Sequence, residues 1–442
     1  MRVAAARRYD QRVPKLSIGL IGCGTVGGAF VELLTERREI IATRTGVELT
    51  IGQIAVRSPE KYRDRGIAAE LFTDDPQSVV ENPEIDVVVE LIGGLDPARA
   101  LIRRALELGK PVVTGNKELL AAHGTELYAA AAASGVDLLF EAAVAGGIPL
   151  VRVLRESLVG EDVNRVTGII NGTTNFILTK MAEEGADYAD ALAEAQRLGY
   201  AEADPTADVE GFDAGAKAAI IASIVFGAGV VPDDVHHEGI SGVTAADIES
   251  ARRLGYVIKA LAVIDREDGP DGPAIGVRVH PAMVPHHHPL ATVNDSFNAV
   301  FVEGTAVGEL MFYGRGAGGD PTASAVLGDV IDAAVNLMNG DAARLVISDR
   351  ATVRSVDAMR SQFYLTMKVS DRPGVLAQVA AIFGQHGVSI QTMEQWGAGD
   401  EAEIYFILHE TTTAAIRETL AELSKVDAVQ GIGSVIRLVD GR

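Results

Sequence analysis

Short apolar runs alternate with amphipathic stretches along residues 16–145. The runs have the length of buried strands and cover residues 16–21, 49–56, 86–92, 111–114 and 136–141. Helical periodicity fills two of the gaps between them, at 26–36 and 97–108. Because strands that are separated by helices form parallel sheets, this part of the chain predicts a doubly wound α/β domain.

Residues 146–317 show a different order, in which helical periods come before β-rich stretches. The helical periods cover 173–184, 188–198, 212–227 and 244–254. The β-rich stretches cover 256–264, 274–284 and 298–312. We expect an α+β domain inserted into the first one. A further helical period at 322–339 lies in a segment, about 318–350, that should return to the first domain and complete it.

The last part of the chain, residues 362–438, predicts a small unit of its own after a polar linker at 341–356. Strand patterns occur at 363–369, 388–395, 403–409 and 429–439. Helical patterns occur at 374–386 and 413–423. The resulting order βαββαβ is typical of a ferredoxin-like fold.

Composition narrows the classes of partner. The chain has 39 Lys and Arg against 61 Asp and Glu, a net charge of −22, which repels polyphosphate and argues against nucleic acid. The longest apolar run, 218–231, is too short to cross a bilayer, so no membrane partner is expected. Cys23 is the only cysteine, and residues 1–15 lack the apolar core of a signal peptide. We expect a soluble cytoplasmic protein with a mobile tail at residues 1–12.

The first expected strand runs into a G-x-G-x-x-G sequence that opens an amphipathic helix. Gly22 allows the tight turn, Gly24 lets the backbone approach a pyrophosphate, and Gly27 lets helix and strand pack closely. Thr25 and Val26 stand where the helix dipole faces the phosphates. A glycine-rich turn without a ligand is the alternative. The position between strand and helix favours a Rossmann-type dinucleotide site.

Two basic residues, Arg57 and Lys61, follow the second expected strand, where the adenosine ribose is recognised. A cation there accommodates the 2′-phosphate of NADP, so we expect NADP(H) to be preferred and NAD(H) to be possible. Alternatively, both are solvated surface charges. Gly93 and Thr114 mark other strand ends, where ligands of such sheets bind, and Lys117 should lie at the rim of the same cleft unless it is an ordinary surface lysine.

Charged residues are concentrated between a helix that ends at Gly199 and a second helix that begins near residue 211. The loop between them carries the carboxylates Glu202, Asp204, Asp208 and Glu210. Asp213 falls in the first turn of the second helix and Lys217 one turn later, before an apolar continuation. A lysine beside carboxylates at the mouth of a buried helix can serve as a proton donor. The alternative is an i,i+4 salt bridge that only supports the helix.

Several of these motifs resemble those of homoserine dehydrogenases, in the same order over residues 16–340. The motifs are Gly19–Gly27, Asn116-Lys117-Glu118, Asn171-Gly172-Thr173-Thr174-Asn175, the acidic stretch that ends at Lys217, and Gly314–Gly319 with Pro321-Thr322-Ala323. The resemblance implies NAD(P)-dependent interconversion of L-homoserine and L-aspartate 4-semialdehyde, in threonine, methionine and isoleucine biosynthesis. It also implies that the inserted domain serves catalysis and dimerisation.

The resemblance assigns roles to single residues. Lys217 matches the proton donor and acceptor, and Lys117 matches a second active-site lysine near nicotinamide and substrate. Positions that match substrate-binding or cleft-lining carboxylates are Glu202, Asp208 and Asp213. Positions that match further cofactor contacts are Gly199 and Gly316.

The resemblance further implies one bound monovalent cation, sodium, held mostly by backbone carbonyls. The matching positions are Glu141, Val144, Gly146 and Ile148. Glycines in this loop permit carbonyls to point inward. We do not expect a transition metal at His286, His287 and His288, because adjacent side chains seldom converge on one ion.

At the C-terminus, the turn Asp371–Leu376 and the helix end Gln385–Ile390 resemble ACT domains. This implies L-threonine as an effector and a homodimer or homotetramer. A purely structural dimerisation module is the alternative. We expect deletion of residues 358–442 to leave the activity and to relieve threonine sensitivity.

Two other functions fit the sequence less well. Aspartate-semialdehyde dehydrogenase chemistry needs a thiol nucleophile, and Cys23 lies in the phosphate loop. A non-catalytic NADP and amino-acid sensor with the same fold is the second alternative. The charged residues Lys117, Glu202, Asp213 and Lys217 argue against it.

Overall fold

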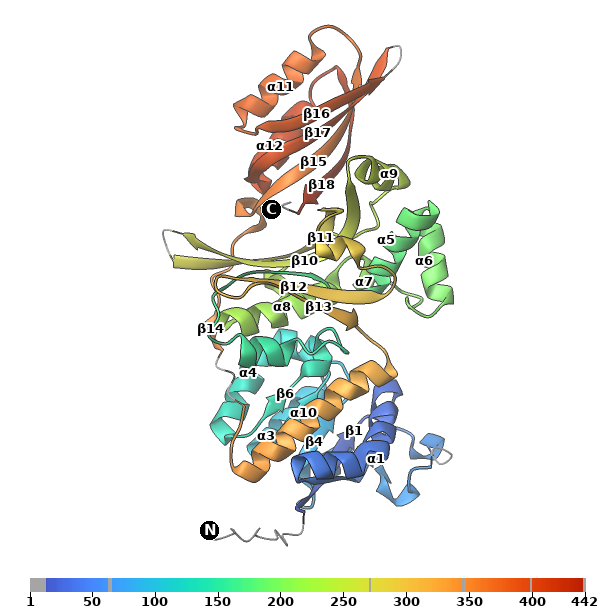
Figure 1. Ribbon diagram of the computed structural model, residues 1–442, viewed down its shortest axis with the longest axis vertical. Coiled ribbons are helices and arrows are strands. Elements are labelled where there is room, and N and C mark those ends of the chain that lie inside the picture. The colour runs from blue at the N-terminus through green and yellow to red at the C-terminus, as the bar shows by residue number, and fades with distance from the viewer. Residues whose placement is uncertain are drawn as a thin grey trace, which may run out of the picture. The chain divides into compact units, whose positions relative to one another are not determined.

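The computed structural model describes residues 13–62, 66–269, 272–343, 345, 347–397 and 400–439 (Figure 1). The expectation for residues 1–12 lies outside this part of the chain. The chain divides into two compact units, Met1–Gly147 with Ala317–Val346, and Ile148–Gly316 with Ile347–Arg442. The second unit is thus inserted into the first, and its C-terminal part follows the returning segment.

The first unit contains a parallel six-stranded sheet in the order β3-β2-β1-β4-β5-β6. The strands are β1 (Lys15–Ile21), β2 (Glu48–Ala55), β3 (Phe72–Thr73), β4 (Val87–Glu90), β5 (Val112–Thr114) and β6 (Leu138–Leu139). Because the strand order reverses between β1 and β4, ligands are expected beyond the carboxyl ends of these two strands. The sheet confirms the predicted Rossmann-type fold.

Helices connect these strands and cover the sheet. They are α1 (Thr25–Thr45), α2 (Pro76–Glu81), α3 (Ala98–Glu107), α4 (Lys117–Ser134) and the returning α10 (Gly319–Asn339). Apolar residues of α1, α10 and the sheet form one buried cluster, so α10 packs beside α1 as part of this domain (Figure 1). The returning segment therefore belongs to the first unit.

The second unit is built on a ten-stranded sheet whose main path is β13-β12-β7-β10-β11-β18-β15-β17-β16. Its first part comprises β7 (Val163–Ile169), β10 (Tyr256–Gly269), β11 (Gly272–Pro285), β12 (Phe297–Gly304), β13 (Gly308–Arg315) and the short β9 (His236–His237). The predicted β-rich stretch 298–312 divides into β12 and β13, because Gly308 (φ 71°) turns the chain back as a hairpin. The pattern did not reveal β7.

Helices of the second unit pack against this sheet, with α5 and α8 in contact with its central strands. The helices are α5 (Gly172–Glu184), α6 (Tyr188–Arg197), α7 (Thr206–Val209), α8 (Phe212–Phe226) and α9 (Ala245–Arg253). A separate pair of short strands joins β8 (Ala228–Gly229) to β14 (Ser348–Arg350).

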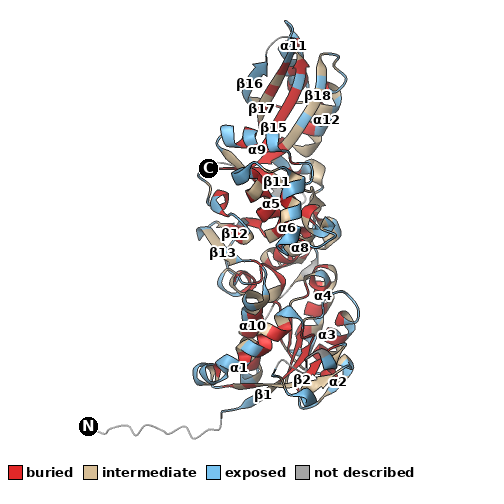
Figure 2. Cartoon of the chain, turned by 90° about the vertical axis from the view of Figure 1, so that its right-hand side faces the viewer, coloured by how far each residue is buried: buried red, intermediate tan, exposed pale blue. Residues whose placement is uncertain are grey.

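The C-terminal residues form the predicted βαββαβ fold. The elements are β15 (Arg360–Ser370), α11 (Val375–Gln385), β16 (Ile390–Gly397), β17 (Glu401–Thr412), α12 (Thr413–Leu423) and β18 (Val429–Leu438). The order β18-β15-β17-β16 is ferredoxin-like, and the middle of β15 is buried (Figure 2).

This C-terminal fold packs into the inserted domain and shares part of its core. Strand β18 pairs with β11 of the inserted domain, and Tyr364, Ile436 and Leu438 share a buried apolar cluster with Met283 and other residues of that domain. Deleting residues 358–442 would expose an edge of β11 and part of its core. The structure therefore argues against the expectation that such a deletion leaves the activity intact.

Candidate functional site

The three glycines of the G-x-G-x-x-G sequence have three different surroundings. Gly22 has φ 98°, and its N–H donates to the Ala55 carbonyl at 2.9 Å. A Cβ atom added at Gly27 would lie 2.3 Å from the Gly22 carbonyl oxygen, whereas one added at Gly24 would meet nothing within 4 Å. Helix α1 begins after Gly24 without a side-chain cap, so the N–H groups of its first turn can receive an anion.

A buried carboxylate, Glu90, organises the neighbouring strand ends. Its side chain accepts hydrogen bonds from the N–H groups of Ile92 (2.8 Å) and Gly93 (3.1 Å) and from the Thr114 hydroxyl (2.6 Å). The Thr114 hydroxyl is therefore engaged in a hydrogen bond with Glu90. Glu90 was not among the predicted site residues, although an acidic residue within an apolar strand run needs such hydrogen-bond partners when it is buried.

Asn116 holds the start of α4, where Lys117 is the first residue. Its side-chain oxygen accepts from the Leu119 N–H (3.1 Å), and its Nδ2 donates to the Gly94 carbonyl (2.7 Å). Both Gly93 and Gly94 have φ 71°, which allows the chain to turn sharply after β4. The half-buried Lys117 thus stands beside the carboxyl ends of β4 and β5.

Arg57 is exposed and lies two residues beyond the end of β2. This places it at the carboxyl edge of the sheet, next to the glycine loop that Ala55 contacts. The side chain of Lys61 lies outside the described residues.

The loop predicted to hold a cation is mostly buried. Glu141 is buried and its N–H donates to Asp329 of α10 at 2.7 Å, and Val144 and Gly146 are buried too. The left-handed residue of the loop is Ala145 (φ 52°), not a glycine, which corrects the expectation that glycines turn the carbonyls. Ile148 begins the other compact unit.

In the second unit, Lys217 lies one helical turn after Asp213 on α8. Its Nζ donates to Asp213 Oδ2 at 2.7 Å and to the Ile170 carbonyl at 2.8 Å. The side chains of Lys217 and Asp213 are only 12% and 8% exposed. The i,i+4 pair, which the sequence offered as the alternative to a proton donor, is therefore present, and the contact with Ile170 also fixes the ammonium against the end of β7.

Asn171 joins this pair to a second carboxylate. Its Nδ2 donates to Asp208 Oδ1 at 2.7 Å and to Asp213 Oδ2 at 2.9 Å, while its side-chain oxygen caps α5 by accepting from the Thr174 N–H at 2.9 Å. We call Lys217, Asp213, Asn171 and Asp208 the lysine cluster. Sequence analysis assigned no role to Asn171, because its partners lie 37 and 42 residues away.

Two other predicted residues lie on the loop after α6. Gly199 has φ 79° and ends the helix, and Glu202 is exposed. The backbone oxygen of Glu202 accepts from Gln196 Nε2 at 3.0 Å. Among the described hydrogen bonds, those of the lysine cluster do not include Glu202.

Gly316 lies beside the same end of β7 as the lysine cluster. A Cβ atom added there would fall 1.1 Å from Asn298 Oδ1, so any other residue would have to displace the Asn298 side chain. Asn298 is buried, and its Nδ2 donates to the Ile169 carbonyl at 2.8 Å. The next carbonyl, that of Ile170, accepts from Lys217.

With this geometry established, three family models match the chain. One described as "Homoserine dehydrogenase" matches residues 149–331, one described as "Homoserine dehydrogenase, NAD binding domain" matches 22–141, and one described as "ACT domain" matches 363–428. The homoserine dehydrogenase of Corynebacterium glutamicum is 49% identical over 431 residues, covering 96% of this chain and 95% of that protein. The chain belongs to the homoserine dehydrogenase family.

Solved structures of the same family agree with the fold. The homoserine dehydrogenase from Thiobacillus denitrificans superposes with a TM-score of 0.90 at 42% identity, covering 96% of this chain and 98% of that one. A hyperthermophilic archaeal homoserine dehydrogenase in complex with NADPH gives a TM-score of 0.62 at 31% identity, covering 73% and 98%. Family members are oxidoreductases, and this chain carries both the nucleotide-binding domain and the ACT domain.

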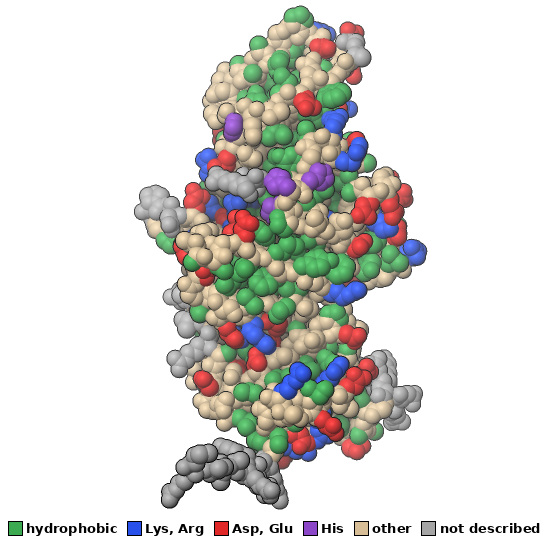
Figure 3. Space-filling view, in the orientation of Figure 1, with side chains coloured by type: hydrophobic (Ala, Val, Ile, Leu, Met, Phe, Trp, Pro, Cys, Tyr) green, Lys and Arg blue, Asp and Glu red, His purple; other side chains and the backbone are tan. Residues whose placement is uncertain are grey.

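Outside these sites, the described residues show no further feature that points to a particular ligand or partner. On the face shown in Figure 3, acidic and basic side chains of the described residues are interspersed. Among the described helices, none combines the length and hydrophobicity that a membrane span requires. Within the same residues, no three His, Cys, Asp or Glu side chains are grouped for a metal ion.

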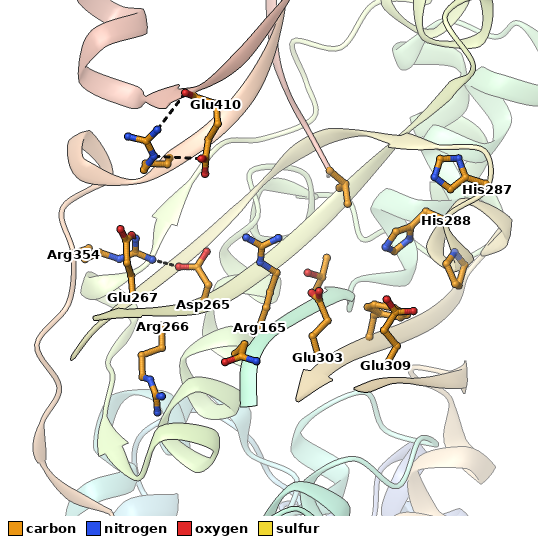
Figure 4. Close-up of a pocket in the computed structure, with 16 residues that line it drawn as sticks. Arg165, Asp265, Arg266, Glu267, His287, His288, Glu303, Glu309, Arg354 and Glu410 are labelled. Carbon is orange, nitrogen blue, oxygen red and sulfur yellow. Dashed lines mark hydrogen bonds and ion pairs between the residues drawn. The ribbon is translucent and has the colours of Figure 1, made fainter. Parts of the chain in front are cut away.

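A pocket of about 750 Å³ lies elsewhere in the second unit, between β7, β10, β12, β13 and the ACT strands. Charged side chains make up most of its lining, and some of them pair, including Arg354 with Asp265 and Arg360 with Glu410 (Figure 4). It contains none of the residues of the lysine cluster. Its size therefore does not mark the candidate active site.

Proposed function

We propose that the chain interconverts L-homoserine and L-aspartate 4-semialdehyde with a nicotinamide cofactor, and that Lys217 is the proton donor in aldehyde reduction and the acceptor in the reverse direction. The observation that carries this proposal is the placement of the Lys217 ammonium, held by Asp213 and the Ile170 carbonyl at the start of a buried helix. The cofactor supplies or accepts the hydride. A positioned ammonium stabilises the negative charge that develops on the aldehyde oxygen and donates the proton.

The other residues of the lysine cluster fix this ammonium. Asp213 balances its charge, and both amide hydrogens of Asn171 are used to hold Asp213 and Asp208. We assign homoserine binding to Asp208, Asp213 and Glu202, with Glu202 contacting the α-ammonium. Because Glu202 is exposed, its carboxylate is accessible to a charged ligand.

For the cofactor, we assign the pyrophosphate to the loop Gly22–Gly27 and further contacts to Gly93, Thr114, Lys117, Gly199 and Gly316. Lys117 would act as the second lysine near the nicotinamide. We propose a preference for NADP(H) over NAD(H), because the exposed Arg57 stands beyond β2, where a 2′-phosphate would be recognised. Lys61 is assigned to the same phosphate. Comparing the KM values for NADPH and NADH in wild type and Arg57→Ala tests this assignment, and an unchanged ratio would contradict it.

A monovalent cation, sodium, would be held by the backbone carbonyls of Glu141, Val144, Gly146 and Ile148. The buried loop and the left-handed Ala145 support this, since they hold peptide groups in fixed directions. We expect sodium to raise the thermal stability of the protein relative to choline at equal ionic strength. Equal stabilities in the two salts would count against the site.

The ACT domain would bind L-threonine and pair with a second copy, in a homodimer or homotetramer. The turn at 371–374, with Gly374 at φ 93°, borders a hollow of about 380 Å³ lined by Gln395 and Ile404 among others. Inhibition by L-threonine but not by D-threonine is expected. If neither L-threonine nor D-threonine inhibited the protein, the ACT domain would have a structural role only.

The activity itself is tested by incubating the protein with L-homoserine and NADP and following the absorbance of the reduced cofactor, with L-serine as the control alcohol. We expect reduction with homoserine only. A protein that binds NADP but shows no homoserine-dependent reduction would be a sensor and not the proposed enzyme.

A further inference from the structure

A short segment packs directly onto the turn of α8 that carries Asp213 and Lys217. In this segment, the His237 ring lies where a side chain at Gly215 would be, since a Cβ atom added at Gly215 would fall 2.0 Å from His237 Nε2. The same ring lies against the ring of Phe212, with centroids 5.0 Å apart. Helix α8 begins without a side-chain cap, so this packing constrains its first turn together with the hydrogen bonds that Asp213 receives from Asn171 and Lys217.

Two further glycines mark close approaches around the same corner. A Cβ atom at Gly239 would lie 2.3 Å from Glu210 Oε2 and 2.8 Å from the Val209 carbonyl oxygen. One at Gly211 would lie 3.0 Å from Val279 of β11. Residues 236–239 therefore pack closely against residues 209–215, where α7 meets α8. A shift of this segment must displace those residues. We call residues 236–239 the coupling segment.

The coupling segment also meets the last strand of the ACT domain. Strand β10 pairs along the whole of β11, so β9 and β18 share the remaining edge of β11. They lie end to end there, since His237 is opposite Val279 and Arg437 is opposite Ala282.

An ion pair closes this junction. The buried Arg437 of β18 donates to Glu238 Oε2 at 2.5 Å, and Glu238 also bonds His236 at 2.7 Å. Burial alone would raise the pKa of Glu238, but the hydrogen bond with His236 and the charge of Arg437 lower it to about 2. The carboxylate is therefore ionised at neutral pH.

We propose that the coupling segment is a positioning element between the ACT domain and the catalytic helix, with Glu238 as its contact to Arg437 and His237 as the positioning residue for the turn of Asp213 and Lys217. This inference rests on the proposed role of Lys217. Movement of β18 displaces Glu238 through Arg437, and the adjacent His237 moves the first turn of α8. Because a small displacement of a catalytic group raises the barrier to reaction, such a movement lowers kcat.

The catalytic side is tested with Gly215→Ala, His237→Ala and the double variant. Gly215→Ala would displace the His237 ring from its place against Gly215. His237→Ala removes the ring and leaves that space empty. Each single change should lower kcat with homoserine about three- to thirtyfold, the usual range for coupling residues. In the double variant the alanine methyl occupies the vacated space, so kcat should recover. The Kd for NADP should stay unchanged, because the glycine loop lies in the other compact unit.

The ACT side is tested with Arg437→Met, which loses the ion pair but keeps contact with the Phe363 ring beneath it. The matched control is Arg417→Met, which breaks the exposed pair between Arg417 of α12 and Asp357, just before β15. We expect Arg437→Met to lower kcat within the same range and the control to keep it. Combined with His237→Ala, Arg437→Met should add little, because both changes disable one element.

Two results would overturn the proposal. Folded His237→Ala and Arg437→Met proteins with wild-type kcat would show that the segment positions nothing, and fully additive losses would show that its two ends act independently. Failure of the proposed function is recognised separately, since the wild-type protein would then lack homoserine-dependent reduction of NADP.

Discussion

Replacing Asn171 with serine separates its two roles. Its side-chain oxygen caps α5, and its Nδ2 holds Asp208 and Asp213. Serine is also a good N-cap residue, so Asn171→Ser keeps an acceptor for the cap but removes the two amide donors. Asn171→Ala removes both.

The size of the effect follows from these contacts. A hydrogen bond to a charged group contributes about 1.5–3 kcal/mol. If Asp213 loses its bond from Asn171 in the enzyme–substrate complex, kcat/KM for homoserine should fall about 10- to 150-fold. Asn171→Ala should show a similar kinetic loss and should also be less stable than Asn171→Ser by about 1 kcal/mol, because it lacks the cap.

The assay is steady-state oxidation of homoserine at saturating NADP, together with urea unfolding of each variant. Asp187→Ala is the matched control, because Asp187 caps the exposed helix α6 by accepting from the Asp190 N–H at 3.0 Å. The control should lose stability and keep its kinetics. Wild-type kcat/KM in Asn171→Ser, or a kinetic loss that appears only in Asn171→Ala, would refute this reasoning.

Three further predictions follow from single contacts. Gly27→Ala places a methyl 2.3 Å from the Gly22 carbonyl oxygen, so the Kd for NADP should rise at least about tenfold by calorimetry; unchanged binding would remove the loop from the cofactor site. Gly316→Ala should displace Asn298, lower kcat and weaken NADP binding, because Gly316 is assigned to a cofactor contact beside the lysine cluster. Normal kcat and normal NADP affinity would contradict this placement. Burial lowers the pKa of Lys259 to about 8 from 10.5, against the charges of Glu183 and Asp295. Between these pH values the unfolded chain binds more protons, so stability should rise with pH by up to about 3 kcal/mol, and Lys259→Met should abolish that rise in urea unfolding.

Features encoded by neighbouring residues could be predicted from the sequence. The glycine loop follows from the spacing of Gly22, Gly24 and Gly27, since each has a separate steric role in one strand–turn–helix unit. The Lys217–Asp213 contact follows from their spacing of one helical turn. The Rossmann-type sheet and the ferredoxin-like fold followed from the period of the apolar positions, because each strand and helix is patterned locally.

Features made by distant segments could not be predicted in this way. Asn171 finds Asp208 and Asp213 only because the start of α5 packs beside the corner of α7 and α8. Glu90 lies in the apolar run 86–92, and its carboxylate is stabilised by hydrogen bonds from the following loop and from β5, which the run itself does not reveal. Pairing of β18 with β11 has no signature in either strand, because a free sheet edge accepts any strand that reaches it.

The central claim, that Lys217 is the proton donor, is tested most directly by Lys217→Ala. The variant should lose homoserine-dependent turnover by at least about a hundredfold while its Kd for NADPH stays at the wild-type value. Lys180→Ala is the matched control, because Lys180 forms an i,i+4 pair with Glu184 on α5 and should keep its activity. A Lys217→Ala protein with the kcat of the wild type would contradict the account.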